Sequence, residues 1–121
     1  MSRDIAYPNH YVRMYHNQLA DIVALEHRYR CPCCGHTMVT PRRDTPANNR
    51  RRDLRTVAHD KPVGFGGDPR IWVYACQGCN TNQAGLSFRS WSLLLRHRGD
   101  RRAAAVAALA DRIDNFLERN T

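Results

Sequence analysis

The sequence predicts an α+β fold: a small unit of two strands and a following helix, stapled by a zinc site of four cysteines and flanked by N- and C-terminal helices. Three observations lead to this prediction. Two Cys-x-x-Cys pairs, Cys31/Cys34 and Cys76/Cys79, bracket the middle of the chain. Two short β-prone runs lie between the pairs, and amphipathic helical patterns lie outside them.

The cysteine spacing favours a structural zinc ion. Two such pairs supply four thiolates at about 2.3 Å from the ion, which completes tetrahedral coordination and leaves no open position. Disulfides are the competing interpretation, but the cysteine count of five is odd and the N-terminus carries no apolar signal segment. Such pairs favour metal in a reducing cytosol, so we expect a cytoplasmic protein. We take Cys31, Cys34, Cys76 and Cys79 as the ligands, although the fifth thiol, Cys33, could exchange roles with a neighbour.

The length of 121 residues suits a single domain that needs such a staple. A chain this short buries too little apolar surface to make a metal superfluous. Within the domain we distinguish an N-terminal helical segment (1–30), a zinc-stapled core (31–95) and a C-terminal helix (96–121). The sequence has no long apolar span, so we expect no membrane partner.

The N-terminal two thirds of the chain predict one helix and two strands. Apolar residues recur near a 3.6-residue period from Tyr11 to Tyr29, which indicates an amphipathic helix. Prolines and asparagines interrupt any period at 40–52, so a loop is expected there. Leu54–Ala58 and Ile71–Ala75 are β-prone runs on either side of a turn at 64–69. The second run ends directly at a cysteine pair.

Two helices are predicted after the second pair. Ser87 is a suitable N-cap for a helix over Phe88–His97, and Gly99 provides a stop. Asp100 then caps a last helix over Arg101–Arg119, whose apolar stripe indicates core packing. These helices are also the surface through which we expect any protein partner to bind.

The chain is basic, with a formal net charge of +8, and all but one of its 19 Lys and Arg residues are arginine. A guanidinium matches phosphate bidentately, so this bias indicates a polyanionic partner, most simply DNA. Genomic composition bias is the alternative explanation. The local concentration is more informative, because one loop-like stretch between the cysteine pairs contains the predicted nucleic-acid contacts Arg42, Arg43, Arg50, Arg51, Arg52 and Arg55.

A histidine at the end of the first predicted strand is the candidate general base. Hydrolysis of a phosphodiester needs a deprotonated water and a divalent cation, and a neutral imidazole at His59 supplies the first requirement. Asn80 is a candidate oxygen ligand for the cation, and Asp60 and Asp68 are the carboxylates nearby. The alternative is that His59 is an ordinary hydrogen-bonded histidine and that Asn80 only caps the following helix.

At residues 28–95 the order of motifs resembles the HNH endonucleases, in their form with a four-cysteine zinc site. The matching residues are Cys31, Cys34, His59, Pro62, Gly66, Gly67, Cys76, Cys79 and Asn80. The resemblance implies a ββα-metal finger that hydrolyses DNA, encoded by a bacterium or a phage. It also implies that His59 is the general base and that Asn80 helps to hold a catalytic Mg²⁺ or Mn²⁺.

Two departures from the family pattern limit this prediction. Ala58 stands where the family usually has a metal-binding aspartate, and Ile71 stands where it usually has an asparagine that orients the base. Asp60 is the residue that could substitute as the metal ligand. Loss of the metal carboxylate is expected to cost orders of magnitude in rate, because the ion supplies several kcal/mol of transition-state stabilisation.

Three hypotheses therefore remain open. The first is an HNH-like endonuclease of weakened activity that acts through a variant metal site. The second is a catalytically inactive zinc-stapled module that still binds DNA. The third is a zinc-stapled interaction protein that meets a protein partner through its C-terminal helices.

Overall fold

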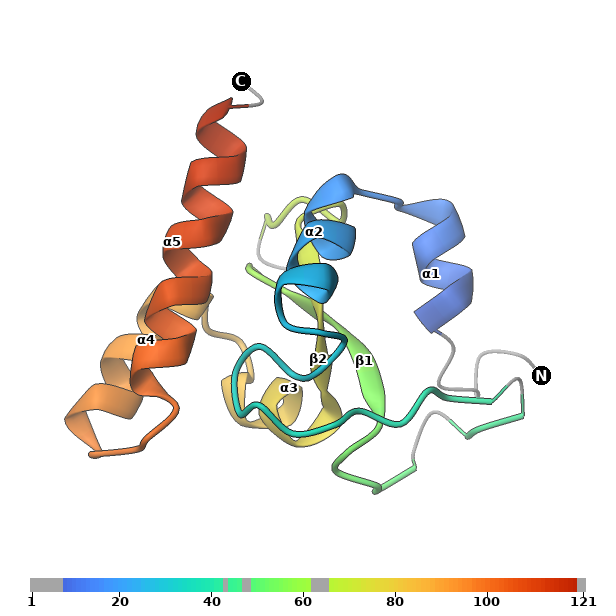
Figure 1. Ribbon diagram of the computed structural model, residues 1–121, viewed down its shortest axis with the longest axis horizontal. Coiled ribbons are helices and arrows are strands. Elements are labelled where there is room, and N and C mark those ends of the chain that lie inside the picture. Colours follow the sequence, from blue (N-terminus) through green and yellow to red (C-terminus); the bar gives the residue numbers. More distant parts are fainter. Residues whose placement is uncertain (1–7, 43, 47–48, 62–65, 120–121) are drawn as a thin grey trace.

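The computed structural model describes residues 8–42, 44–46, 49–61 and 66–119 and confirms the predicted α+β architecture. A two-stranded antiparallel sheet lies among the helices (Figure 1). The elements in order are α1 (Pro8–Met14), α2 (Gln18–Glu26), β1 (Arg55–His59), β2 (Trp72–Cys76), α3 (Gln77–Gln83), α4 (Phe88–His97) and α5 (Ala103–Arg119).

The prediction of one helix over 11–29 is wrong, because the structure has two helices, α1 and α2, in this part of the chain. The break lies at Asn17, whose side-chain oxygen accepts a hydrogen bond of 2.7 Å from the amide of Ala20. This is an N-cap, which starts a new helix and requires a non-helical backbone at the capping residue. The helix also ends early, since Arg28 and Tyr29 have positive φ angles of 54° and 61°.

The two strands pair in antiparallel fashion, and their register places the candidate site residues at the two ends of the sheet. Arg55 pairs with Cys76, and His59 pairs with Trp72. Both strands begin and end one residue later than predicted. At about 3.4 Å per residue, the four steps along β1 separate His59 from the level of Cys76 by roughly 13 Å. The histidine and the cysteine ligand thus lie at opposite ends of the sheet.

The C-terminal helices pack on one another at one edge of the molecule (Figure 1). Helix α4 has the predicted bounds, and the Ser87 hydroxyl accepts a hydrogen bond of 3.1 Å from the Ser90 amide. Helix α5 begins two residues later than predicted, after Asp100. In the described ranges of the chain, no helix is both long enough and apolar enough to cross a membrane.

One buried core joins the sheet to the helices. Trp91 from α4 is its largest member, and α2 packs against β2. Three of the four predicted zinc ligands are part of the same core, so the cysteine cluster is continuous with the hydrophobic interior. The principal buried side chains are Leu19, Val23, Cys31, Trp72, Val73, Phe88, Trp91, Leu95, Val106 and Ile113.

Candidate functional site

The four predicted cysteine ligands converge on one point. The sulfur atoms of Cys31, Cys34, Cys76 and Cys79 all lie within 4.8 Å of one another. The Cys34 and Cys76 sulfurs are 3.7 Å apart, and a tetrahedron with bonds of about 2.3 Å has an edge of about 3.8 Å. The four residues are thus close enough to hold a metal ion, and a set of four thiols fits zinc.

Local sequence explains how each pair is shaped. In the first pair, Gly35 adopts a φ of +78° and its amide donates to the Cys31 carbonyl at 2.8 Å, which closes a tight turn. In the second pair, Cys76 caps α3, and its sulfur accepts from the Cys79 amide at 3.4 Å. The amide of Cys76 in turn donates to the Cys31 sulfur at 3.5 Å. Backbone N–H groups therefore stabilise the sulfur atoms on both sides of the cluster.

The fifth cysteine, Cys33, is buried beside the cluster without being one of the four converging residues. Contact with the neighbouring Cys31 sulfur raises the pKa of Cys33 well above that of an ordinary thiol. The same contact lowers the pKa of Cys31. The pKa values of Cys76 and Cys79 are raised as well, so these shifts do not separate ligands from neighbours, and the assignment of Cys33 as a packed thiol rests on the convergence of the other four sulfur atoms.

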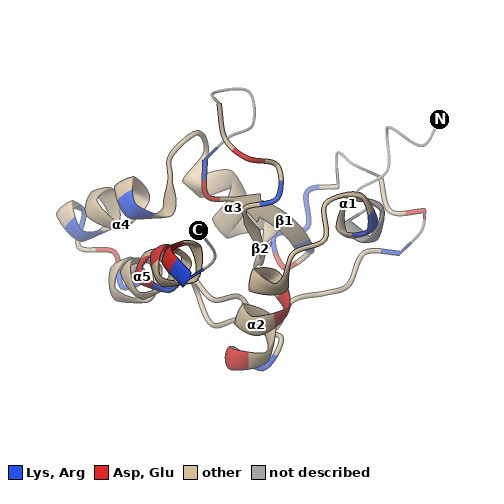
Figure 2. Cartoon of the chain, turned by 90° about the horizontal axis from the view of Figure 1, so that it is seen from above, with Lys and Arg blue, Asp and Glu red and all other residues tan. Residues whose placement is uncertain are grey.

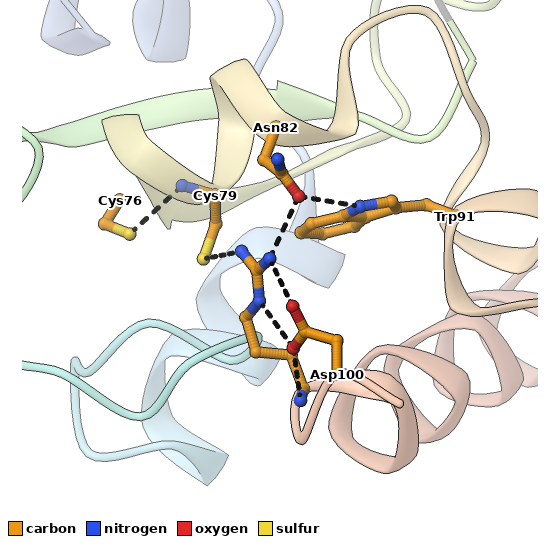
Figure 3. A network of polar contacts seen from close by, with 6 residues as sticks. Cys76, Cys79, Asn82, Trp91 and Asp100 are labelled. Carbon is orange, nitrogen blue, oxygen red and sulfur yellow. Dashed lines mark hydrogen bonds and ion pairs between the residues drawn. The ribbon is translucent and has the colours of Figure 1, made fainter. Parts of the chain in front are cut away.

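A guanidinium from the turn before α5 contacts the cysteine cluster (Figure 3). Arg102 Nη1 lies 3.6 Å from the Cys79 sulfur, and Nη2 donates to Asn82 Oδ1 at 3.0 Å. Asp100 pairs with the same guanidinium at 2.8 Å, and this pairing lowers the pKa of Asp100 to about 2. The guanidinium also lies over the ring of Trp91, 5.3 Å from its centroid. Arg102 is therefore fixed on several sides and places positive charge beside a thiolate ligand.

We expect Arg102→Met to speed zinc release to a chelator by about tenfold or more, because outer partners of metal ligands typically contribute 10- to 100-fold to affinity. The substitution keeps an apolar stem over Trp91 but removes the N–H donors. The neighbouring Arg101→Met is the matched control, since Arg101 is exposed. Release is followed with a colorimetric chelator, and equal rates for the two variants would contradict the role of Arg102.

The candidate base, His59, is oriented by a tyrosine from α1. Its Nε2 atom lies 2.6 Å from the Tyr11 hydroxyl, whose oxygen also lies 2.9 Å from the Pro69 carbonyl oxygen. The hydroxyl has a single proton, so the tautomer of the imidazole decides whether the hydroxyl donates to Nε2 or accepts from it. With the hydroxyl proton directed at the carbonyl, Nε2 carries the imidazole proton and Nδ1 is the basic nitrogen. Burial lowers the pKa of His59 below 6.5, which favours this neutral form.

The candidate ligand Asn80 faces β1, but its side chain bonds to the middle of the strand and not to its end at His59. Its amide nitrogen donates to Thr56 Oγ1 and to the Val57 carbonyl, both at 3.1 Å. The side chain that reaches the end of β1 is Gln83, one turn further along α3, whose amide donates to the His59 carbonyl at 2.9 Å. Asn80 thus holds α3 against the strand through its nitrogen and presents its oxygen as the group that could bind a cation.

The two positions that concern a metal carboxylate are both engaged in the fold. Ala58 is 0% exposed and belongs to the hydrophobic core. The Asp60 carboxylate accepts a hydrogen bond of 3.1 Å from the amide of Phe88, the first residue of α4. One Asp60 oxygen therefore accepts a hydrogen bond from the first residue of helix α4. Ala58 contributes only a methyl group to the space between β1 and α3.

The arginines of the predicted DNA-binding stretch have different environments. Arg51 forms an ion pair with Asp53, with N–O distances of 2.6 and 3.4 Å. The Arg55 guanidinium stacks over Tyr74 at 4.5 Å from the ring centroid. Arg50 and Arg52 line one cavity beside α3. Arg42 is exposed, and Arg43 lies outside the described residues. The stretch thus does not act as one uniform basic surface.

Basic residues elsewhere are spread over the molecule. Figure 2 shows them on α1, α4 and α5 as well as in the loops. Several are neutralised within the chain: Arg89 pairs with Asp111 and Asp114, and Arg112 pairs with Glu26. The net charge alone therefore does not locate a binding surface.

Comparison of the chain with protein-family models, curated proteins and solved structures finds no match. The site therefore has to be interpreted from its own geometry. Three of its residues were missed by sequence reasoning: Tyr11, Gln83 and Arg102. Gln83 could have been found, because it lies three positions after Asn80 and so shares its helix face. Tyr11 and Arg102 reach the site from distant parts of the chain, and no sequence pattern signals their contacts.

Proposed function

We propose that this protein is an HNH-like endonuclease that hydrolyses phosphodiester bonds in DNA with a divalent metal ion, at a weakened rate. The observation that carries the proposal is the geometry of His59. The imidazole stands at the end of β1, and its Nε2 atom is held 2.6 Å from the Tyr11 hydroxyl. A base of this kind can take a proton from a water that attacks phosphorus. The order of two strands, a cysteine pair and a helix is consistent with the ββα-metal finger of the family.

In this proposal the resident ion of the four cysteines is a structural Zn²⁺. The set of four thiols leaves the ion no open position for a substrate, so its contribution is to the fold. The catalytic Mg²⁺ or Mn²⁺ is a second ion, for which the Asn80 oxygen and the second oxygen of the Asp60 carboxylate are the proposed ligands. A bound divalent ion would stabilise the negative charge that develops on the phosphate.

A second candidate function is supported by Ala58 and Asp60, the two positions from which a metal-binding carboxylate could come. Ala58 offers no ligand, and the Asp60 carboxylate is bonded to the Phe88 amide. A finger without a metal carboxylate could bind DNA and leave it intact. We therefore propose, as the alternative, a zinc-stapled DNA-binding module that has lost cleavage.

Incubation of supercoiled plasmid with the purified protein separates the two functions. Cleavage that depends on added Mg²⁺ or Mn²⁺, and that follows the protein peak through two different columns, is expected for the endonuclease. Electrophoretic retention of the plasmid without nicking, with both ions and over long incubation, would refute the endonuclease and leave the binding module. Absence of both effects at low salt would refute both functions.

A further inference from the structure

A polar cavity of about 700 Å³ lies against the outer side of the second cysteine pair. The arginine stretch forms one wall, and helix α3 together with the start of β1 forms the other. Its lining contains two guanidinium groups and several amide and hydroxyl groups, and no carboxylate. The lining residues are Asn49, Arg50, Arg52, Thr56, Gln77, Gly78, Asn80, Thr81 and Asn82.

The backbone that presents the two arginines is tied to α3. The Gly78 amide donates to the Arg52 carbonyl at 2.9 Å, and the Gln77 amide donates to the Leu54 carbonyl at 2.8 Å. The Gln77 side chain donates to the Asn49 carbonyl, and to the Arg51 carbonyl at 3.1 Å. These bonds hold the stretch in place before any ligand arrives, which reduces the entropy lost on binding.

A glycine in α3 allows one guanidinium to lie close to the helix. A Cβ atom at Gly78 would be 3.2 Å from Arg52 Nε and 3.4 Å from Arg52 Nη2, so a side chain at this position would require the guanidinium to shift by a few tenths of an ångström. Among the described residues, no carboxylate pairs with Arg50 or Arg52, whereas Arg51 between them is paired with Asp53. Arg50 and Arg52 thus bring to the cavity positive charge that no carboxylate among the described residues neutralises.

We propose that this cavity is a binding subsite for a backbone phosphate of duplex DNA, with Arg50 and Arg52 as the charged donors. Guanidinium groups suit the oxygens of a phosphate diester, and the amides of the lining supply further donors. The cavity shares Asn80 and Thr56 with the face of β1 that carries the candidate cation ligand. The inference rests on DNA being the partner in the proposed function.

Fluorescence anisotropy with a labelled DNA duplex tests the subsite. We expect Arg52→Ala to weaken binding by about tenfold at low salt and to reduce the slope of log K against log salt by about one, as one lost phosphate contact predicts. Arg51→Ala is the matched control, because it removes the same charge from the next residue but breaks an intrachain ion pair. We expect Arg51→Ala to change the slope by less than half as much, and Arg50→Ala to resemble Arg52→Ala.

Two results would overturn the subsite: unchanged binding by Arg52→Ala, or an equal loss for Arg51→Ala and Arg52→Ala, which indicates diffuse charge attraction. Plasmid cleavage measured on the same preparations keeps this outcome separate from the proposed function. Metal-dependent cleavage by a wild-type protein whose Arg52→Ala variant binds normally would reject the subsite alone. A specific loss of binding in Arg52→Ala without any cleavage by the wild type would reject the endonuclease alone.

Discussion

Replacing Cys76 with serine is expected to abolish zinc binding and folded structure together. The Cys76 sulfur joins both cysteine pairs, because it lies 3.7 Å from Cys34 and accepts the Cys79 amide at the start of α3. Structural zinc contributes about 10–16 kcal/mol of binding free energy in zinc-finger peptides, and small domains are stable by only about 5–15 kcal/mol. Loss of one of four thiolates therefore removes more stabilisation than the rest of the fold can replace. Native mass spectrometry measures zinc, and far-UV circular dichroism measures the helices.

Cys33→Ala is the matched control for this prediction. Cys33 is as buried as the ligands but is not one of the four that converge. We expect this variant to retain one zinc ion per chain and a cooperative unfolding transition. Zinc loss from Cys33→Ala together with zinc retention by Cys34→Ala would show that Cys33 is the true ligand. A folded, zinc-bound Cys76→Ser would reject the metal centre itself.

The second large effect is expected at the candidate base. His59→Ala should lower metal-dependent DNA cleavage by about 10²- to 10⁴-fold, the usual contribution of a general base. Duplex binding should stay within about twofold, because the basic cavity is formed by other residues. The measurement is the initial rate of plasmid nicking at saturating protein, with anisotropy for binding. A rate equal to that of the wild type would remove His59 from the mechanism.

The pH dependence gives an independent check on His59. Burial lowers its pKa below 6.5, so the neutral imidazole persists to a lower pH than in an exposed histidine. A general base acts only when neutral, so cleavage should rise with pH through this lowered pKa and pass half of its maximum below pH 6.5. A rate that begins to rise only above pH 6.5 would contradict the assignment.

Tyr11→Phe serves as the matched variant for the same group. It retains the ring packed edge-on against His59 and removes the hydroxyl that is hydrogen-bonded to Nε2. We expect slower cleavage, an altered pH profile and normal duplex binding, since the hydroxyl positions the imidazole and Tyr11 does not line the basic cavity. The tautomer is observable by ¹⁵N NMR of the imidazole in both proteins. A wild-type tautomer that is identical to that of Tyr11→Phe, together with an unchanged pH profile, would contradict a positioning role for Tyr11.

The sequence predicted those parts of the fold that are encoded by local patterns. The strands flanking residues 60–71 and helix α4 follow from β-branched runs, an apolar stripe and a serine cap, which are local signals. The N-terminal helix was mispredicted, because the apolar period continues across Asn17 while the cap interrupts the backbone. The predicted turn at 64–69 and the matched Pro62 fall partly or wholly outside the described residues.

The part of the candidate site that could be predicted is the part that the spacing of residues along the sequence indicates. Four cysteines in two pairs are enough to indicate a metal centre from the sequence alone. The surroundings of that centre depend on contacts between distant residues. Tyr11 lies 48 positions from His59, and Arg102 lies 23 positions from Cys79. No period or motif reports such contacts, so the hydrogen-bond partner of the histidine and the charge beside the Cys79 sulfur follow only from the three-dimensional fold.

Helix α3 has only seven residues, and a helix of that length is not stable in isolation. Four of its side chains nevertheless contact three neighbours: Cys79 faces the cysteine cluster, Asn80 and Gln83 bond to β1, and Asn82 bonds to Arg102. The helix therefore depends on these partners, and they depend on it. Loss of the zinc ion should consequently unfold α3 and the strand that carries His59 in one cooperative event. The cellular supply of zinc would then determine whether this distant histidine is held in its folded position.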